Sequence, residues 1–369
     1  MNILILTWRD LTHPAAGGAE VYTEQVARRW VADGHRVTIV TATVADRPAV
    51  EMIDGYRVVR MGNKYTVYRE ARKWWERTGR YEGYDVVLDM INTVAYRAHR
   101  WIKGVPTVGF AHQTCEEIWH INAPAPAALL GRYVLEPRWL KAYENIPTLA
   151  VSQSTKDALQ RFGVRDVTVV PEGFEPPEMP VGVPKQERPT LVWCARMIDY
   201  KRPLDMLEAA VKLQRIIPDL QTWMIGGGPE LEAVRAMAPA GIEVLGFVDQ
   251  QEKLERMAAA HIHVATSVRE GWGLVVSEAA ALGTPTVAYD VPGLRDSTRA
   301  ANGVVVPPEP DALVDWIPTM LERWAADPPA PIPFGGAHSW DDVAAGVMTA
   351  MLKAAGLPES MAHPVDNVA

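Results

Sequence analysis

Residues 270–278 of this chain read Glu-Gly-Trp-Gly-Leu-Val-Val-Ser-Glu, so two carboxylates enclose a segment that two glycines interrupt. A helix is predicted to begin near Gly273, which places Glu270 in the preceding loop and Glu278 in the second helical turn. Glycines let the backbone approach a ligand closely, and the free N–H groups at the start of a helix favour an anion. A plain amphipathic helix would not carry glycines at these positions, so the stretch indicates a ligand site.

Two cations follow the strand predicted at Thr190–Ala195. Arg196 comes directly after this strand, and Lys201 lies five residues later. Preorganised cations stabilise the negative charge that grows on a leaving phosphate group. Two cations and two carboxylates, each pair after a strand, suit a ligand that carries both phosphate and hydroxyl groups, such as a nucleotide sugar.

Strands and helices alternate along the chain. The first strand, Asn2–Thr7, is apolar throughout, as is typical of strands buried on both faces, and a helix is predicted at Ala19–Asp33. This repetition implies a mainly parallel sheet covered by helices. Further strands are predicted at Arg36–Thr41, Tyr56–Arg60, Asp85–Leu88, Thr107–Phe110, Thr148–Val151 and Val167–Val170 in the first half, and at Thr190–Ala195, Gln221–Ile225, Ile242–Leu245, His263–Thr266, Thr286–Ala288 and Val304–Val306 in the second.

The two α/β halves are separated by Pro171–Pro189, a stretch with six prolines and little periodicity, which predicts a linker. A length of 369 residues also suits two domains better than one core. Ligands of open α/β sheets bind at the carboxyl ends of the strands, so a cleft between the halves is expected. A second proline-rich stretch, Pro328–Pro333, precedes a last helix predicted at Asp341–Ala354.

Together these motifs resemble the retaining glycosyltransferases of glycosyltransferase family 4. The segment 194–201, Cys-Ala-Arg-Met-Ile-Asp-Tyr-Lys, is similar to the family's Gly-Arg-Leu…Lys segment. The resemblance implies the GT-B architecture: two Rossmann-like domains face each other across a cleft, and a C-terminal helix crosses back to the first. We expect an acceptor-side domain over 1–175, a nucleotide-sugar-binding domain over 186–335, the crossover helix within 336–355 and a disordered tail at 356–369.

The resemblance also assigns roles to the charged motif residues. Arg196 and Lys201 correspond to the cations that hold the donor diphosphate. Glu270 corresponds to the carboxylate that binds hydroxyl groups of the donor sugar, and Glu278 to the one that binds the ribose. We therefore expect a donor site made from these four side chains.

Glycines complete the expected donor site. Gly273 and Leu274 begin the predicted helix, and the Leu274 amide is expected to meet the donor phosphate. Gly17 and Gly18 resemble the family's Gly-Gly loop, which lies against the donor phosphate and bounds the acceptor pocket. Gly227 is a candidate for the edge of the base pocket, although three glycines before a proline also form plain turns. No Gly-x-Gly-x-x-Gly fingerprint follows the first strand, which argues against an NAD enzyme.

His112 lies just after the strand that ends at Phe110. The family often has His-Asp here, with the His near the reaction centre, so His112 joins Glu270 and the two cations as a candidate catalytic residue. Gln113 replaces the Asp, and a His after a strand is structural about as often as not. Residues 171–174 read Pro-Glu-Gly-Phe where the family commonly has Pro-Asn-Gly-Val, and no role is transferred to them.

Composition excludes several classes of protein. A formal net charge of −8 argues against a nucleic-acid partner, which favours basic surfaces. Two cysteines, Cys115 and Cys194, indicate no disulfide framework and a reducing compartment. No apolar run approaches the roughly 20 residues of a membrane span, so a cytoplasmic protein is expected. Arg outnumbers Lys and Ala is abundant, which favours a GC-rich bacterial source.

The segment Arg57–Arg80 carries eight basic residues against two acidic ones, with aromatic residues between them. Basic amphipathic helices bind anionic lipid, so the segment is a candidate for peripheral contact with the inner face of a membrane. The alternative is a solvated helix whose aromatic side chains pack on the domain.

The expected function is a retaining glycosyltransferase that moves a sugar from a nucleotide-diphosphate sugar to an acceptor hydroxyl on a glycolipid, an envelope glycan or a secondary metabolite. The resemblance implies a same-face displacement that rests on positioning and charge stabilisation. No Asp-x-Asp metal site accompanies the phosphate residues, so neither a metal nor a cofactor is expected. The alternatives are a sugar-nucleotide epimerase or phosphorylase on the same fold, and a non-catalytic sugar-nucleotide-binding protein.

Overall fold

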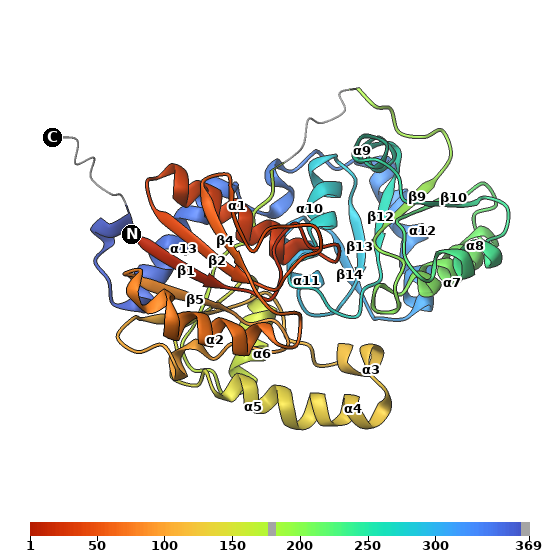
Figure 1. Cartoon of the computed structure of the whole chain (residues 1–369). Coiled ribbons are helices and arrows are strands. Elements are labelled where there is room, and N and C mark those ends of the chain that lie inside the picture. The colour runs from red at the N-terminus through yellow and green to blue at the C-terminus, as the bar shows by residue number, and fades with distance from the viewer. Residues whose placement is uncertain (176–181, 363–369) are drawn as a thin grey trace. The chain divides into compact units, whose positions relative to one another are not determined.

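Two mainly parallel sheets organise the chain (Figure 1). The computed structural model describes residues 1–175 and 182–362. The chain divides into two α/β units: the first contains residues 1–119 and 125–173 and the segment from Ser339 onward, and the second contains residues 120–124 and 174–338. The predicted fold class, two parallel-sheet α/β domains, is confirmed.

The first unit contains an eight-stranded sheet in the order β3-β4-β2-β1-β5-β6-β7-β8. Every strand predicted for this half is present, within two residues at each end. The strands are β1 Asn2–Leu6, β2 Arg36–Thr41, β3 Val50–Ile53, β4 Tyr56–Arg60, β5 Val86–Met90, β6 Thr107–Ala111, β7 Thr148–Ala150 and β8 Val167–Val169.

Strand β3 was not predicted, and it is the one antiparallel member of the first sheet among the described residues. It forms a hairpin with β4 through Asp54 and Gly55, whose φ angles of 45° and 85° are both positive. An Asp-Gly pair favours such tight hairpin turns, so the signal was present in the sequence. Val50 and Met52 are exposed, so the strand shows only a weak alternation of buried apolar and exposed residues. The sequence analysis missed the strand for this reason.

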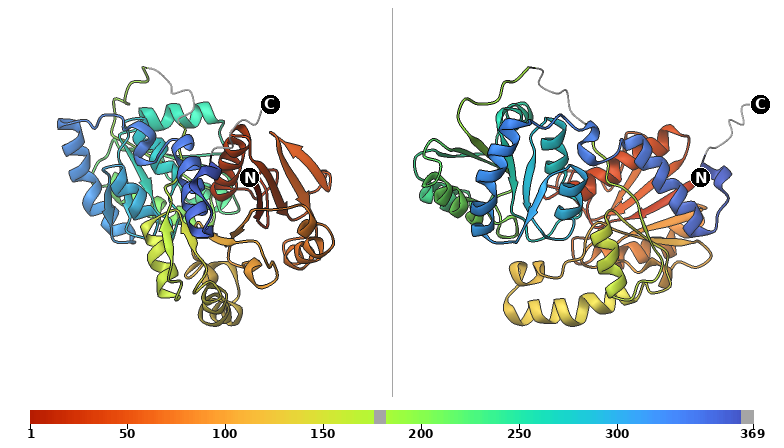
Figure 2. Two further views of the ribbon diagram at one scale, coloured as in Figure 1. Left: turned by 90° about the vertical axis from the view of Figure 1, so that its left-hand side faces the viewer. Right: turned by 180° about the vertical axis from the view of Figure 1, so that it is seen from behind.

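The helices of the first unit cover both faces of its sheet (Figure 2). The final helix α13 packs against α1, and the indole Nε1 of Trp30 donates to the carbonyl oxygen of Ala344 at 3.0 Å. The expected return of the C-terminal helix to the first domain is therefore confirmed. The helices are α1 Gly18–Ala32, α2 Val67–Arg77, α4 Ala125–Leu130, the π-helical turn Gly131–Leu135, α5 Glu136–Lys141, α6 Gln153–Arg161 and α13 Trp340–Ala355, and α3 Ile118–Asn122 crosses the boundary between the units.

The second unit contains a six-stranded parallel sheet in the order β11-β10-β9-β12-β13-β14. Its strands are β9 Thr190–Cys194, β10 Gln221–Ile225, β11 Ile242–Gly246, β12 Ile262–Ala265, β13 Thr286–Tyr289 and β14 Val304–Val306. Its helices are α7 Pro203–Gln214, α8 Leu231–Met237, α9 Gln250–Ala259, α10 Leu274–Ala281, α11 Leu294–Ala300 and α12 Pro310–Ala326. All six strands predicted for this half are present.

The expectation of a disordered tail from residue 356 is wrong for its first seven residues. Gly356, with a φ of 65°, ends α13, and a short 3-10 helix follows at Glu359–Ala362. Met361 packs on the core of the first unit, and Nε2 of His35 lies 3.1 Å from the carbonyl oxygen of Ala362. Apolar side chains beyond the helix therefore extend its packing. Residues 363–369, and residues 176–181 of the predicted linker, lie outside the described residues.

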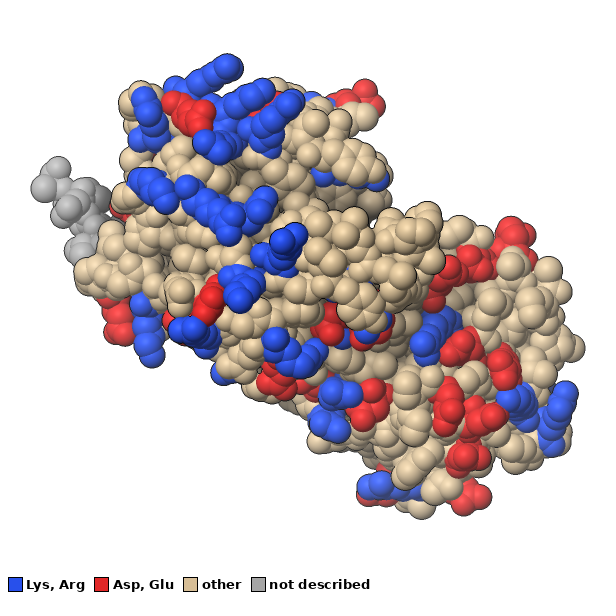
Figure 3. Space-filling model, turned by 90° about the horizontal axis from the view of Figure 1, so that it is seen from below, with Lys and Arg blue, Asp and Glu red and all other residues tan. Residues whose placement is uncertain are grey.

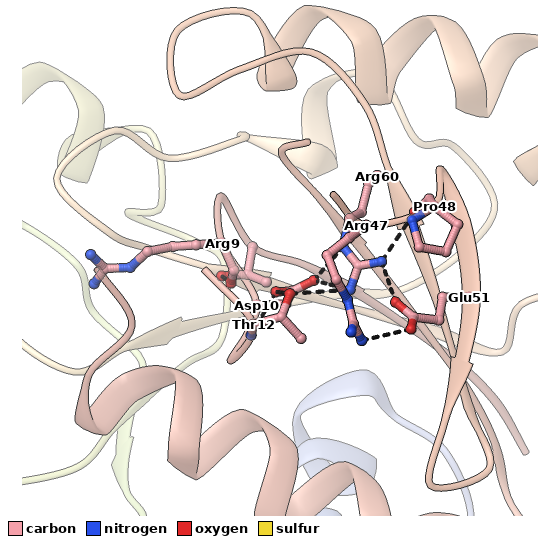
Figure 4. A network of polar contacts seen from close by, with 8 residues as sticks. Arg9, Asp10, Thr12, Arg47, Pro48, Glu51 and Arg60 are labelled. Carbon is pink, nitrogen blue, oxygen red and sulfur yellow. Dashed lines mark hydrogen bonds and ion pairs between the residues drawn. The ribbon is translucent and has the colours of Figure 1, made fainter. Parts of the chain in front are cut away.

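A buried arginine holds the loop that follows β1 (Figure 4). The Arg60 side chain, at the end of β4, is fully buried. Its Nε donates to Asp10 at 2.8 Å, and its Nη1 donates to Glu51 at 2.6 Å and to the carbonyl oxygen of Pro48 at 3.1 Å. Asp10 also accepts from the Thr12 amide at 2.9 Å. The Arg60 guanidinium thus ties the β1–α1 loop to the β3–β4 hairpin.

The Arg60→Met variant should lose about 3–5 kcal/mol of stability, because it leaves Asp10 and Glu51 without their shared buried cation. The matched control is Arg47→Met, since Arg47 pairs with the same Glu51 at 2.6 Å but is 37% exposed. This control should lose no more than about 1 kcal/mol. Urea unfolding measures both, and equal losses for the two variants would show that the network does not stabilise the loop.

Candidate active site

Lys201 and Glu270, two of the predicted site residues, form an ion pair in the second unit. Lys201 lies at the end of a short 3-10 helix after β9, and Glu270 lies in the loop between β12 and α10. The side chains are each only 16% exposed. The hydroxyl of Ser267 donates to the same Glu270 oxygen at 2.6 Å. The fold thus brings together Lys201, the residue predicted to bind phosphate, and Glu270, the residue predicted to bind the sugar, although they are far apart in sequence.

Glu278 pairs with a residue that the sequence analysis missed. Nζ of Lys253, on α9, donates to Oε1 of Glu278, on α10, at 2.8 Å, and the two side chains are 21% and 17% exposed. No local pattern marks this lysine, which lies on an ordinary amphipathic helix. Only the packing of α9 beside α10 reveals the pair, so the site contains two lysine–glutamate pairs rather than one.

Arg196 does not join either pair. It is exposed, and its Nη2 donates to the hydroxyl of Tyr200 at 3.1 Å. No ion pair to a carboxylate is recorded for it among the described residues. Its guanidinium therefore faces solvent after β9 and is accessible to an anionic ligand.

Glycines allow the backbone of the site to close around Glu270. Gly273, the N-cap residue of α10, has a φ of 97°, a conformation that other residues rarely adopt. Gly293, which the sequence analysis missed, has a φ of 77°, and a Cβ there would lie 2.0 Å from the carbonyl oxygen of Glu270. The Glu270 amide in turn donates to the carbonyl oxygen of Pro292 at 3.0 Å. The Pro-Gly pair before α11 was the available signal for this close approach.

The three glycines after β10 differ in their packing. A Cβ at Gly226 would lie 1.8 Å from the carbonyl oxygen of Ala195, and one at Gly228 would lie 2.3 Å from that of Met197. A Cβ at Gly227, the residue named as a donor-site candidate, would meet only Phe247 at 3.8 Å. Packing therefore explains Gly226 and Gly228 but does not require glycine at Gly227.

In the first unit, Gly17 and Gly18 lie where α1 begins. The Gly17 amide donates to Oε2 of Glu20 at 2.7 Å, and Oε1 of the same carboxylate accepts from Nε of Arg9 at 2.8 Å. Gly17 has an extended backbone with a φ of −150°, and a Cβ there would make ordinary contacts. The loop is thus held at this end by the buried Glu20, as it is held at its start by Arg60.

His112 lies after β6, beside Tyr22 and Phe110, with ring centroids 5.1 and 5.0 Å away. Its Nε2 is buried and has no hydrogen-bond partner among the described residues. Burial lowers the pKa of His112 to about 3, so the ring is neutral. Its carbonyl oxygen accepts from the Thr155 hydroxyl at 2.9 Å. An unpaired neutral nitrogen of this kind can accept or donate one hydrogen bond to a ligand.

Two further properties concern metals and membranes. Within residues 1–175 and 182–362, no three His, Cys, Asp or Glu side chains come together as metal ligands. In the same ranges no helix is both long enough and apolar enough to span a bilayer.

Two family models of glycosyltransferases match this chain. Residues 16–177 match the model described as Glycosyltransferase Family 4, and residues 176–328 match the one described as Glycosyl transferases group 1. This chain belongs to glycosyltransferase family 4. The named relatives of this glycosyltransferase are glycosyltransferases, and none of them supports the epimerase, phosphorylase or non-catalytic alternatives.

Three curated relatives illustrate the family. The gpi3 subunit of phosphatidylinositol N-acetylglucosaminyltransferase from Schizosaccharomyces pombe is 23% identical, over 85% of this chain and 71% of its own. D-inositol 3-phosphate glycosyltransferase from Nocardioides is 28% identical, over 77% and 72%. A GDP-mannose-dependent phosphatidylinositol dimannoside mannosyltransferase from Mycobacterium tuberculosis is 23% identical, over 84% and 85%.

Solved structures of glycosyltransferases share the GT-B fold with this chain. Sucrose-phosphate synthase from Thermosynechococcus elongatus is 19% identical with a TM-score of 0.68, over 96% of each chain. The lipopolysaccharide glycosyltransferase WaaG is 17% identical with a TM-score of 0.65, over 99% of this chain and 100% of its own. HepE from Anabaena, solved with UDP-glucose, is 18% identical with a TM-score of 0.64, over 96% and 98%.

In this glycosyltransferase, Glu172 stands at the position where the family commonly has Asn, and it is buried after β8. Burial raises the pKa of Glu172 well above its ordinary value of 4.5. The pKa of the neighbouring Tyr22 is raised by burial and, in addition, by Glu172. The folded first unit therefore favours the uncharged form of the Glu172 carboxyl group beside Tyr22.

The Glu172→Gln variant should be increasingly more stable than the wild type as pH rises above 4.5. Above that pH the unfolded chain loses the Glu172 proton while the folded chain retains it, so the wild type loses stability until the raised folded pKa is reached. The amide cannot ionise and avoids this loss. Melting temperatures at acidic and mildly alkaline pH measure the difference.

The control is Glu232→Gln, whose carboxylate is 79% exposed and pairs with Arg235. It should change the melting temperature little at either pH. A Glu172→Gln difference that stayed constant between the two pH values would mean that Glu172 is ionised in the folded chain.

Proposed function

We propose that this glycosyltransferase is a retaining enzyme that takes its sugar from a nucleotide-diphosphate sugar. The observation that carries the proposal is the pair of lysine–glutamate contacts beside the start of α10, Lys201 with Glu270 and Lys253 with Glu278. Each pair offers a cation for phosphate and a carboxylate for hydroxyl groups. A nucleotide-diphosphate sugar carries a diphosphate between two sets of such hydroxyls, on the ribose and on the sugar.

In this proposal Lys201 exchanges its contact with Glu270 for the donor diphosphate. The exchange leaves the charge of Lys201 compensated and frees the Glu270 oxygens for hydroxyl groups of the sugar. The exposed Arg196 supplies a second cation, and the Leu274 amide at the start of α10 supplies a hydrogen-bond donor. Gly293 keeps the loop backbone against Glu270, so the carboxylate is positioned before the ligand arrives.

Glu278 is proposed to bind the two ribose hydroxyls, because a carboxylate has two oxygens that can accept from neighbouring hydroxyl groups. Lys253 holds this carboxylate through its 2.8 Å contact. Lys253 thereby acts as a positioning residue for the proposed ribose site. Neither a metal nor a cofactor is assigned a role.

The proposed transfer is a same-face displacement. The bond between the anomeric carbon and the diphosphate oxygen breaks, and the diphosphate leaves with the bonding electrons. The acceptor hydroxyl forms the new bond from the same side, and its proton passes to the leaving phosphate oxygen. Arg196 and Lys201 stabilise the growing charge of the diphosphate. His112, neutral with an unpaired Nε2, is proposed to hydrogen-bond the donor sugar.

The relatives suggest the class of acceptor. Their names contain phosphatidylinositol, D-inositol 3-phosphate and phosphatidylinositol dimannoside, in that order. We therefore propose a polyol or glycolipid hydroxyl as the acceptor here. The nucleotide sugars named differ, since one relative is GDP-mannose-dependent and one solved structure contains UDP-glucose, so a panel of nucleotide sugars is needed. A ligand at 100 times its Kd should stabilise the protein by about 2.7 kcal/mol.

The two carboxylates should respond differently when each is replaced by alanine. Glu278→Ala should weaken binding of a nucleoside diphosphate without its sugar, by roughly 1–3 kcal/mol, because ribose hydrogen bonds are lost. Glu270→Ala should leave this binding intact or strengthen it, since Lys201 is released from its partner, but should reduce sugar transfer. Calorimetry with UDP and GDP, beside an assay of transfer, measures both effects.

Equal loss of nucleotide affinity in both variants would refute the separate roles. Transfer itself must depend on acceptor. A change in the donor sugar without acceptor would instead indicate an epimerase, and phosphate-dependent release of the sugar would indicate a phosphorylase.

A further inference from the structure

A buried hydroxyl group joins the two loops that carry Lys201 and Glu270. Thr266 directly follows β12 and is only 1% exposed. Its hydroxyl donates to the carbonyl oxygen of Lys201 at 2.7 Å, and the carbonyl oxygen of Arg202 lies 3.1 Å away. The loop between β12 and α10 therefore holds the backbone of Lys201, in addition to the ion pair between the Lys201 and Glu270 side chains.

The hydrogen bonds of the Thr266 hydroxyl run in one direction. The indole Nε1 of Trp193, on β9, donates to this hydroxyl at 2.9 Å. An indole N–H can only donate and a carbonyl oxygen can only accept, so the hydroxyl must give its single proton to the carbonyl groups of the turn. Trp193 is 1% exposed and belongs to the core of the second unit. The core thereby orients the hydroxyl, and the hydroxyl holds the turn that contains Lys201.

The turn needs this support because its backbone is strained. Arg202 has a φ of 51° and a ψ of 56°, a left-handed conformation that residues other than glycine rarely adopt. Such a conformation persists when the surrounding structure holds it. Thr266 contacts the carbonyl groups of both peptide units that flank the Arg202 Cα. The Val268 amide ties the same two loops again, since it donates to the carbonyl oxygen of Tyr200 at 2.7 Å.

Charge alone does not distinguish Lys201 from other cations of the second unit. On the surface of this unit that Figure 3 shows, at the right of the view, acidic and basic side chains are intermixed. Lys212, for example, is also paired with two carboxylates, those of Glu208 and Asp311. Lys201 differs because a buried hydroxyl group holds its backbone, which fixes the point from which its side chain reaches Glu270.

We propose that Thr266 is a positioning residue for Lys201 and that Trp193 orients it. Thr266 itself touches no ligand in this scheme. Its hydroxyl keeps the Lys201 backbone in place while Nζ moves from Glu270 to the donor diphosphate, so the cation meets the diphosphate without a rearrangement of the turn. The inference rests on the proposed function, because Thr266 acts only through the contact between Lys201 and the diphosphate. A merely structural Thr266 would stabilise the fold and leave ligand affinity unchanged.

Replacement of Thr266 in two backgrounds tests the proposal, with calorimetry of UDP and GDP binding to the full-length protein. Thr266→Val keeps the shape of the side chain but loses the hydroxyl, and it should weaken binding of the preferred diphosphate by about fivefold. Thr266→Ser keeps the hydroxyl and should bind as the wild type does. In the Lys201→Ala background, Thr266→Val should cause no further loss of affinity, because both changes act on the same contact.

The matched control is Thr284→Val, at the opposite edge of the same sheet, just before β13. Thr284 is fully buried, and its hydroxyl donates to the carbonyl oxygen of Met257 at 2.6 Å and accepts from Nζ of Lys185 at 2.8 Å. This control should lose about as much thermal stability as Thr266→Val, yet bind the diphosphate as the wild type does. Thr266→Cys is a second variant in case the valine variant does not fold. Its thiol is a weaker hydrogen-bond donor, so a smaller loss of affinity is expected.

Three results would overturn the positioning role while the proposed function stands. They are wild-type affinity in the Thr266→Val and Thr266→Cys variants, an equal loss of affinity from Thr266→Val in both backgrounds, and an equal loss of affinity in the Thr284→Val control. Failure of the proposed function has a different signature. Wild-type affinity in Lys201→Ala alone, or a wild type that binds neither UDP nor GDP, would remove the diphosphate contact and the positioning role together.

Discussion

The candidate site in the second unit is held by one contact, the ion pair between Lys201 and Glu270. Two side chains of opposite charge, each 16% exposed, would be costly to bury alone. The pair therefore holds the loop after β9 and the loop before α10 in one arrangement. Gly293 and Pro292 fix the backbone of Glu270 from the other side. In the proposed exchange, a diphosphate compensates the charge of Lys201, and sugar hydroxyl groups donate hydrogen bonds to the Glu270 carboxylate.

The first unit uses buried charge in a different way. Arg60 and Glu20 hold the two ends of the loop that leads from β1 into α1. Neither side chain is free to meet a ligand, so the loop is positioned by residues that take no part in chemistry. His112 differs, because its Nε2 is buried and has no hydrogen-bond partner within residues 1–175 and 182–362. The contrast separates residues that stabilise the site from residues that a ligand could engage.

Most strands and the glycines of the candidate site could be predicted from the sequence, because the patterns that indicate them lie within short segments of the chain. Apolar runs predicted thirteen strands, the first at Asn2–Thr7 and twelve further along the chain. Glycines predicted the start of α10, where Gly273 adopts a left-handed backbone conformation. What was missed depends on contacts across the chain. Lys253 carries no pattern of its own, and only the packing of α9 against α10 brings it to Glu278. Residues 356–362 were expected to be disordered because the chain leaves the helix at Gly356, yet Met361 finds an apolar surface formed by distant segments.

The basic segment 57–80 shows the same limit. Counting charges treated Arg57, Arg60 and the cations of α2 alike. In the fold, Arg57 and Arg60 form buried or partly buried ion pairs, whereas the ion pairs of α2 lie at the surface. Val67, Ala71 and Trp75 of the segment face the core, whereas Tyr65 is 77% exposed. A surface function could not be assigned to it until the helix had been placed on its sheet.

The central claim is that Lys201 leaves Glu270 to hold the donor diphosphate, and the rate of sugar transfer by Lys201→Ala tests it most directly. The account predicts a loss of roughly 2–4 kcal/mol of transition-state stabilisation, with folding preserved. Lys212→Ala is the control, since Lys212 is also paired with carboxylates but lies on the exposed face of α7. Unchanged transfer in Lys201→Ala would contradict the account.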